Sequence, residues 1–247
     1  MGDIKPLALV FGGSRGIGAA CVDVLASEGF DVAFTYTNRP DTTREPEGKA
    51  GAHGVPVRGY GVDIRDAAAV DAVFSNVKSE FGRPVHAVIA NAGINVPPAT
   101  VRQFADEDFR RLVEVNIVGA FHVLRAAARE VADGGSIVAL TTSLVRHAVA
   151  GLGPYSATKA AVECLVRSMA KELAPRHVRV NAVAPGPIDT DLFRAGKTEE
   201  ARQRSAGMSP LNRVGTPEEV AAVVAFLVSQ KASWVDGQIV QTNGALV

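Results

Sequence analysis

The chain has 247 residues, 47% of them hydrophobic and 21% charged, which suits one well-filled domain at the upper end of single-domain size. Its 26 basic and 26 acidic residues cancel, so no long-range field is available to attract nucleic acid or an anionic membrane. Neither an export signal nor a membrane-spanning run is recognisable, and we expect a cytoplasmic protein that acts on small molecules.

Short apolar runs alternate along the chain with longer segments whose apolar residues keep a helical period. The predicted strands are 7–11, 31–35, 85–90, 136–141, 178–184 and 239–241. The predicted helices are 16–28, 67–81, 106–132, 154–173 and 217–227, the last with Thr216 as its N-cap. This order predicts a single α/β domain over 1–247, a doubly wound parallel sheet with helices on both faces.

Two segments follow this alternation less clearly, and the chain has two cysteines. Prolines and glycines in 38–54 oppose a stable helix there. The polar, proline-bounded segment 187–212 is predicted to be a mobile lid over a substrate. Cys21 and Cys164 lie within apolar helical patterns, so we expect two buried free thiols, with neither a disulfide nor a metal site.

A glycine-rich turn follows the first predicted strand directly. Its residues are Gly12, Gly13, Ser14, Arg15, Gly16, Ile17 and Gly18, and a helix begins within them. Backbone without side chains can approach a pyrophosphate, while the free N–H groups and the dipole of the helix face its charge. The turn therefore predicts a dinucleotide site.

The end of the second predicted strand indicates which dinucleotide binds. After Tyr36 the chain continues through Asn38 and Arg39, and the first carboxylate is Asp41. An acidic residue at this place would bind the 2′-hydroxyl of NAD, whereas an arginine accommodates the phosphate of NADP. Arg39 and Arg15 can offer bidentate donors to a phosphate, so NADP(H) is predicted over NAD(H).

A tyrosine and a lysine at helical spacing form the candidate proton-transfer pair. Tyr155 and Lys159 are four residues apart and project from one helix face. A neighbouring lysine cation stabilises a phenolate, so Lys159 is expected to lower the pKa of Tyr155. Ser143 follows a strand, where α/β sheets place ligand groups, and Asn116 is a polar residue inside an apolar helix.

Taken together, these motifs resemble the Rossmann-type short-chain dehydrogenase/reductase family over essentially the whole chain. The resemblance implies a catalytic tetrad of Asn116, Ser143, Tyr155 and Lys159. Ser143 precedes Tyr155 by twelve positions, whereas many members have thirteen, which keeps Thr142 as the alternative hydroxyl. The family commonly has a threonine where this chain has Phe11.

The resemblance also implies a set of cofactor contacts along the chain. Besides Tyr155 and Lys159, they are Gly12, Ser14, Arg15, Gly16, Ile17, Gly18, Tyr36, Asn38, Arg39, Asp63, Ile64, Asn91, Ala92, Gly93, Pro185, Gly186, Ile188 and Thr190. Asp63 is the candidate for the adenine amino group. The segment 185–190 resembles the one that lies beside the nicotinamide in the family.

The implied activity is NADP(H)-dependent hydride transfer between nicotinamide and a carbonyl or secondary alcohol, as in 3-oxoacyl-acyl-carrier-protein reductase-like members. A sugar, polyol or small ketone is an equal candidate substrate, and a non-catalytic NADP(H) sensor is the alternative function. Arg146, His147 and Phe193 are candidates for a substrate pocket, although exposed loop positions would account for them as well. The resemblance further implies a homotetramer, with a dimer as the alternative.

Overall fold

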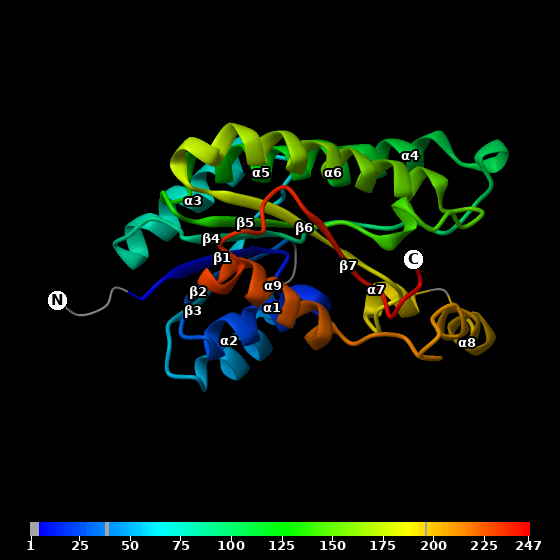
Figure 1. Cartoon of the computed structure of the whole chain (residues 1–247), viewed down its shortest axis with the longest axis horizontal. Coiled ribbons are helices and arrows are strands. Elements are labelled where there is room, and N and C mark those ends of the chain that lie inside the picture. The colour runs from blue at the N-terminus through cyan, green and yellow to red at the C-terminus, as the bar shows by residue number, and fades with distance from the viewer. Residues whose placement is uncertain (1–4, 38–39, 196) are drawn as a thin grey trace.

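The computed structural model describes residues 5–37, 40–195 and 197–247, which form three layers with a parallel sheet in the middle (Figure 1). Within these residues the sheet has seven strands in the order β3-β2-β1-β4-β5-β6-β7. The strands are β1 Leu7–Phe11, β2 Asp31–Tyr36, β3 Val57–Gly61, β4 Ala87–Ala90, β5 Ser136–Leu140, β6 Arg179–Pro185 and β7 Ile239–Thr242. This confirms the predicted doubly wound α/β fold.

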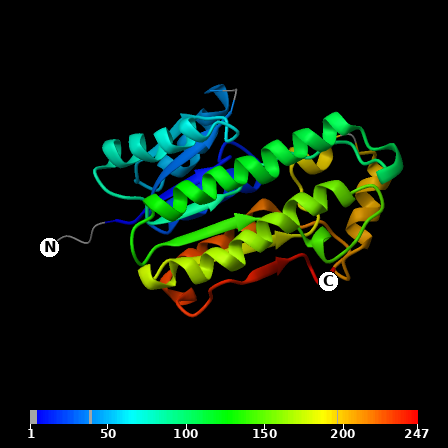
Figure 2. The ribbon, with the colours of Figure 1, turned by 90° about the horizontal axis from the view of Figure 1, so that it is seen from above.

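Helices cover both faces of the sheet. On the face that is uppermost in Figure 1 lie α3 Ala67–Phe81, α4 Asp106–Val113, α5 Ala120–Glu130 and α6 Gly153–Leu173. On the opposite face lie α1 Gly16–Ser27, α2 Arg44–Gly51 and α9 Pro217–Val228. Figure 2 shows α5 and α6 side by side over the sheet. Each face has its own hydrophobic core, because successive side chains of a strand point to opposite sides.

The central strands are buried on both faces, as a parallel sheet between two helical layers requires. Residues 7–11 of β1 are all buried, and β1 pairs with β2 on one side and β4 on the other. Because every strand runs in the same direction, the turns at their carboxyl ends meet at one edge of the sheet. The short helices α7 Asp191–Arg194 and α8 Glu199–Gly207, within the predicted lid, also lie at this edge (Figure 1).

Two elements differ from the sequence-based expectation. The segment 38–54 was predicted to lack a stable helix, but α2 forms in it because Pro46 is the third helical residue, where a missing N–H breaks no helical hydrogen bond. Pro46 and Ala50 are buried, and Lys49 pairs with Asp23 of α1 at 2.9 Å. Strand β3 was missing from the prediction, since its polar and glycine residues at the sheet edge give no continuous apolar run.

The predicted helix over 106–132 is interrupted. Between α4 and α5 the chain forms the π-helical segment η3, Glu114–Gly119, which contains Asn116. π-helical segments of this kind are rare and often occur at functional sites. The last helix begins as predicted: Thr216 and Glu219 form a capping box, with Pro217 in the first turn.

The cysteines are both free, but only one has the predicted burial. Cys21 is fully buried in α1, where burial raises the pKa of its thiol to about 12. Cys164 is exposed on α6, so the expectation of a buried thiol is wrong there. Its Sγ accepts a hydrogen bond from Arg167 at 3.2 Å. The helical period around Cys164 reflects the buried face of α6, from which this residue points away.

Across the described residues, neither a helix long and apolar enough to cross a membrane nor a cluster of metal-binding side chains is present.

Candidate active site

The glycine turn between β1 and α1 has the shape that a phosphate site needs. Gly12 and Gly16 adopt φ angles of +75° and +54°, which side-chain-bearing residues rarely adopt. A Cβ on Gly18 would lie 2.0 Å from the carbonyl oxygen of Gly12. Arg15 is the exposed N-cap of α1, and none of the described side chains caps this helix end. Its N–H groups and dipole therefore face any anion held in the turn.

Hydrogen bonds from neighbouring strands fix this turn. The N–H of Gly12 donates to Thr35 Oγ1 at 3.0 Å, and Asn91 Nδ2 donates to the carbonyl of Gly12 at 2.9 Å. Ala92 lies against the same glycine, where a Cβ on Gly12 would approach its Cα to 3.0 Å. Thr35 was missed from the sequence because its partner is set by strand pairing. It supplies a hydroxyl to the turn although Phe11 stands where the family commonly has threonine.

The predicted adenine side lies at the carboxyl ends of β2 and β3. The ring of Tyr36 lies beside Gly61, 3.6 Å from where its Cβ would be. Asp63 forms an ion pair with Arg65 at 2.6 Å, and this hydrogen-bonded guanidinium lowers the pKa of the carboxyl. Ile64 is buried. The two candidates Asn38 and Arg39 lie outside the described residues.

Asn116 and Lys159 come together beneath Gly93. A Cβ on Gly93 would lie 3.1 Å from Asn116 Oδ1 and 3.3 Å from Lys159 Nζ. The carboxamide of Asn116 accepts from the N–H of Ile94 and donates to its carbonyl, each at 2.9 Å. It also donates to Thr158 Oγ1 at 3.3 Å. Asn116 thus ties η3 to α6 and to the loop after β4, contacts that local sequence does not reveal.

Lys159 is a buried ammonium group. Its Nζ donates to the carbonyl of Leu140, the last residue of β5, at 2.9 Å. Burial lowers the pKa of Lys159 to about 8. The group therefore carries its charge at neutral pH and loses it within a pH range that enzyme assays can reach.

Tyr155 lies one helical turn before Lys159 and is half-buried. Burial raises the pKa of Tyr155 to about 12, which is the opposite direction to the lowering expected from Lys159. A phenol that keeps its proton at neutral pH is chemically able to donate it.

Thr142 and Ser143 both follow β5 and are both buried. Ser143 Oγ donates to the carbonyl of Ala184 at 3.1 Å, which ties it to β6. Thr142 Oγ1 accepts from the N–H of Leu144 at 3.3 Å and caps the short helix η4, Ser143–Val145. Each hydroxyl has one internal partner, so both remain candidates for the substrate oxygen.

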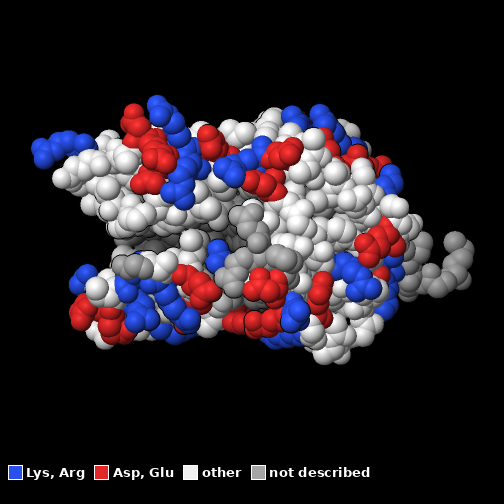
Figure 3. All heavy atoms as spheres, turned by 180° about the vertical axis from the view of Figure 1, so that it is seen from behind, with Lys and Arg blue, Asp and Glu red and all other residues white. Residues whose placement is uncertain are grey.

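The segment 185–190 approaches the glycine turn from β6. Pro185 ends the strand, and Gly186 packs so closely on Asn243 that a Cβ would lie 2.9 Å from the Cβ of that residue. Ile188 is buried, and Thr190 caps α7. A Cβ on Gly16 would lie 3.2 Å from Thr190 Cγ2, so the start of the predicted lid lies directly over the turn. Figure 3 shows the surface hollowed between its two halves, with charges of both signs around the hollow.

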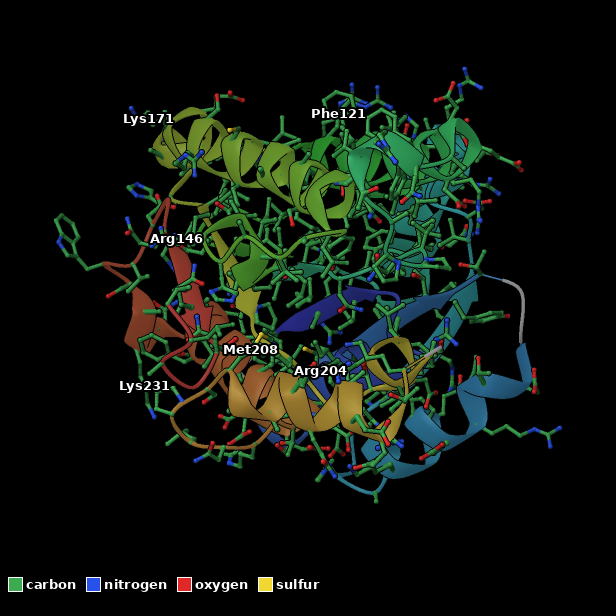
Figure 4. The ribbon with its side chains drawn as sticks, turned by 90° about the vertical axis from the view of Figure 1, so that its right-hand side faces the viewer. Phe121, Arg146, Lys171, Arg204, Met208 and Lys231 are labelled. Carbon is green, nitrogen blue, oxygen red and sulfur yellow. The ribbon has the colours of Figure 1, made fainter. Side chains whose placement is uncertain are left out.

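The three candidates for a substrate pocket have different surroundings. Arg146 is exposed, and in Figure 4 it lies between α6 and the lid, with Met208 and Arg204 on the side of α8. The N–H of His147 donates to the carbonyl of Ser143 at 2.8 Å. Phe193 is partly buried beneath the ammonium of Lys197, which lies 3.5 Å from the ring centroid.

The surface has two further hollows, and the second is lined in part by the cofactor-contact candidate Ile188. One of about 730 Å³ lies between α6 and the loop before β7, and one of about 290 Å³ lies between the base of the lid and α9. Neither is lined by Tyr155 or Lys159. The candidate active site is therefore defined by the converging side chains at the sheet edge.

Comparisons with known proteins show similarity over nearly the whole chain. The family model described as enoyl-(acyl carrier protein) reductase matches residues 12–245. The NADPH-dependent aldehyde reductase-like protein, chloroplastic, of Arabidopsis thaliana is 36% identical over 98% of this chain and 94% of its own length. The 3-oxoacyl-acyl-carrier-protein reductase MabA of Mycobacterium tuberculosis is 35% identical over 96% of this chain and 91% of its own length.

A solved structure is similar over the same extent. The short chain dehydrogenase from Burkholderia cenocepacia J2315, in complex with NADP, has a TM-score of 0.90 and 32% identity, and the match covers 98% of this chain and 97% of that chain. Sequence, fold and the order of the candidate residues thus lead to one conclusion. The chain belongs to the short-chain dehydrogenase/reductase family.

Proposed function

We propose that this protein is an NADP(H)-dependent oxidoreductase that interconverts a carbonyl and a secondary alcohol. The observation that carries the proposal is the meeting of Lys159 Nζ and Asn116 Oδ1 beneath Gly93, at the sheet edge that also carries the glycine turn. Tyr155 projects from the same helix face as Lys159. A protein that only sensed the nucleotide would have no need of this proton-transfer pair.

The residues around the turn fit a dinucleotide. Gly12, Gly16 and Gly18 keep the backbone open at the N-terminus of α1, and Asn91 holds the turn in place. Arg15 stands exposed at this end and would contact the extra phosphate of NADP. Both the Arabidopsis relative and the Burkholderia structure carry NADP or NADPH in their names.

Each candidate catalytic residue has its own role in the proposed reduction. Bound NADPH would supply the hydride. Ser143, or Thr142 in its place, would hydrogen-bond the substrate oxygen, and Tyr155 would give that oxygen its proton. Lys159 would hold the nicotinamide ribose and stabilise the phenolate left behind, while Asn116 would support a water that returns the proton. In the oxidative direction Tyr155 acts as the base.

The names of two relatives support two substrate classes as the first to test. Aldehydes and 3-oxoacyl thioesters are the first substrates to test, because relatives at 36% and 35% identity are named for these activities. The lid over 187–212 would select among them, with Phe193 and Arg146 at its opening. We further propose a single domain over 1–247, a reducing cytoplasmic location that suits two free thiols, and assembly as a homotetramer.

The test follows the absorbance of NADPH and NADH at 340 nm with a panel of aldehydes, ketones, 3-oxoacyl thioesters and sugars. We expect turnover with NADPH in preference to NADH, and we expect Arg15→Gln to reduce that preference by about tenfold. Binding of NADPH without turnover across the panel would favour the sensor. An unchanged preference in the variant would remove Arg15 from phosphate recognition.

A further inference from the structure

A buried threonine stands between the two candidate catalytic residues of α6. Thr158 follows Tyr155 by three residues and directly precedes Lys159, and only 1% of its surface is exposed. Burial of a hydroxyl is costly unless the group is hydrogen-bonded. The hydroxyl of Thr158 takes part in two hydrogen bonds, one within α6 and one with another element. These two partners account for its burial.

The first partner belongs to the π-helical segment η3. Asn116 Nδ2 donates to Thr158 Oγ1 at 3.3 Å, although the two residues are 42 positions apart in the sequence. The same nitrogen donates to the carbonyl of Ile94 at 2.9 Å. Because an amide nitrogen carries two hydrogens, both donors of Asn116 are used inside the protein. The carboxamide, itself in a residue that is 1% exposed, therefore holds η3 in place and has no hydrogen left for a ligand.

The second partner is the backbone of the candidate proton donor. Thr158 Oγ1 donates to the carbonyl of Tyr155 at 2.7 Å. At the other end, the N–H of Ile94 donates to Asn116 Oδ1 at 2.9 Å. Each group thus donates to the next, from the loop after β4 through η3 to the turn of α6 that carries Tyr155. Hydrogen bonds that point the same way along such a chain strengthen one another.

The geometry of the candidate active site depends on where η3 lies. Asn116 Oδ1 and Lys159 Nζ both approach the position of a Cβ on Gly93, at 3.1 Å and 3.3 Å. Without the hydroxyl of Thr158, one hydrogen of the Asn116 carboxamide would be buried without an acceptor, which costs more than the bond itself contributes. The carboxamide would turn toward another acceptor, and η3 would shift relative to Lys159.

We infer that Thr158 is a positioning residue whose buried hydroxyl fastens η3 to α6 and so keeps Asn116 in register with Tyr155 and Lys159. The inference rests on the proposed reductase function for its kinetic consequences. Thr158 acts on the reaction through Asn116 and the backbone of Tyr155, and it needs no contact of its own with substrate or cofactor.

Three single variants isolate the hydroxyl. Thr158→Val keeps the shape of the side chain and removes the hydroxyl, whereas Thr158→Ser keeps the hydroxyl. Ser156→Ala is the matched control, because Ser156 Oγ also donates to a helical carbonyl of α6, that of Leu152 at 2.9 Å. The comparison therefore separates the link to η3 from the general effect of losing a hydroxyl from this helix.

The kinetic measurement is kcat for carbonyl reduction together with NADPH affinity. We expect Thr158→Val to lower kcat by about tenfold, as small displacements in a site do, while NADPH affinity changes by less than about threefold. Thr158→Ser and Ser156→Ala should keep kcat within about twofold of the wild type. Wild-type kcat in Thr158→Val would overturn the inference. A loss in Thr158→Ser equal to that in Thr158→Val would also overturn it, because the hydroxyl would then have no part in the effect.

A double-mutant cycle tests whether Thr158 acts through Asn116. In an Asn116→Ala background the amide donor is absent, so Thr158→Val should lower kcat by less than about twofold instead of tenfold. Equal losses in the two backgrounds would contradict a shared role. Circular dichroism of each variant restricts the comparison to folded proteins.

Amide hydrogen exchange tests the inference without any substrate. In Thr158→Val the amides of 114–119 should exchange about tenfold faster than in the wild type, whereas in Thr158→Ser and Ser156→Ala they should not. The amides of α9, on the opposite face of the sheet, are the internal reference (Figure 1). Unchanged exchange in 114–119 would refute the positioning role even for a protein without turnover. If the wild type has no reductase activity but the exchange result holds, the proposed function fails and the positioning role stands.

Discussion

Lys159 is the candidate catalytic residue whose titration falls within the pH range of an enzyme assay. Its pKa of about 8 results from burial, whereas Tyr155, at about 12, keeps its proton over the same range. The charged form of Lys159 is present below about pH 8 and is lost above it. We therefore expect kcat/KM for carbonyl reduction to be level below this pH and to fall above it, since kcat/KM reports the free enzyme.

Lys159→Arg provides the check on that assignment. A guanidinium stays charged at any pH used in the assay, so the alkaline limb near pH 8 should move beyond the measured range even if the rate is lower. The measurement is kcat/KM from about pH 6 to pH 10 for both proteins. An alkaline limb that persists unchanged in Lys159→Arg would assign it to another group.

At single residues, the sequence predicts which side chains meet but not their ionisation. The four-residue spacing of Tyr155 and Lys159 predicted a shared face from helix geometry alone. The partner of Lys159 is the carbonyl of Leu140, from another element, and the burial that shifts both pKa values is a property of the assembled layers.

At the scale of elements, Arg179 joins the start of β6 to the end of α9. Its guanidinium donates to the last carbonyls of that helix and of the following turn, those of Leu227, Val228, Ser229 and Ala232. These acceptors have no further helical N–H, so a cation there satisfies them. Arg179→Met should lower the free energy of unfolding by about 2–3 kcal/mol.

Urea unfolding measures this effect, with Lys231→Met as the control. Lys231 is an exposed cation in the same turn, and its replacement should change the free energy of unfolding by less than about 0.5 kcal/mol. Equal stabilities of Arg179→Met and the control would show that the four acceptors find water as readily as the guanidinium.

The elements that sequence reasoning missed have a common physical cause. Strand β3 and helix α2 are weak on their own propensities and form because they pack at the edge of an existing sheet and against α1. The π-helical segment at Asn116 cannot be derived from a periodicity argument, since one extra residue in a turn barely alters the apolar pattern. The strongly periodic helices, by contrast, were predicted to within a residue or two.

At the scale of the whole molecule, α4, η3 and α5 each leave one large apolar side chain partly exposed among charged residues. Phe109, Val118 and Phe121 are between 41% and 46% exposed. Exposed apolar side chains of this kind suit burial against another copy, which supports the proposed homotetramer. Phe121→Glu should reduce the assembly to smaller species, because each copy would have to bury a carboxylate in place of an apolar ring.

Sedimentation equilibrium of the wild type and Phe121→Glu decides this point, with circular dichroism to show that the variant is folded. A wild type that sediments as a single chain of 25.8 kDa would contradict the tetramer, and a wild type of two chains would select the dimer. The alternation of strands and helices predicted the layers of the monomer, but the strand order and any copy-to-copy contact depend on surfaces that meet only in three dimensions.

In the proposed mechanism Tyr155 transfers the proton during NADPH-dependent carbonyl reduction. The most direct measurement is kcat for Tyr155→Phe on the best substrate of the panel, together with NADPH binding followed by fluorescence. We expect a fall in kcat of about a hundredfold or more with NADPH affinity changed by less than about threefold, because only the phenolic hydroxyl is removed. A variant that turns over as fast as the wild type would exclude Tyr155 as the proton-transfer residue.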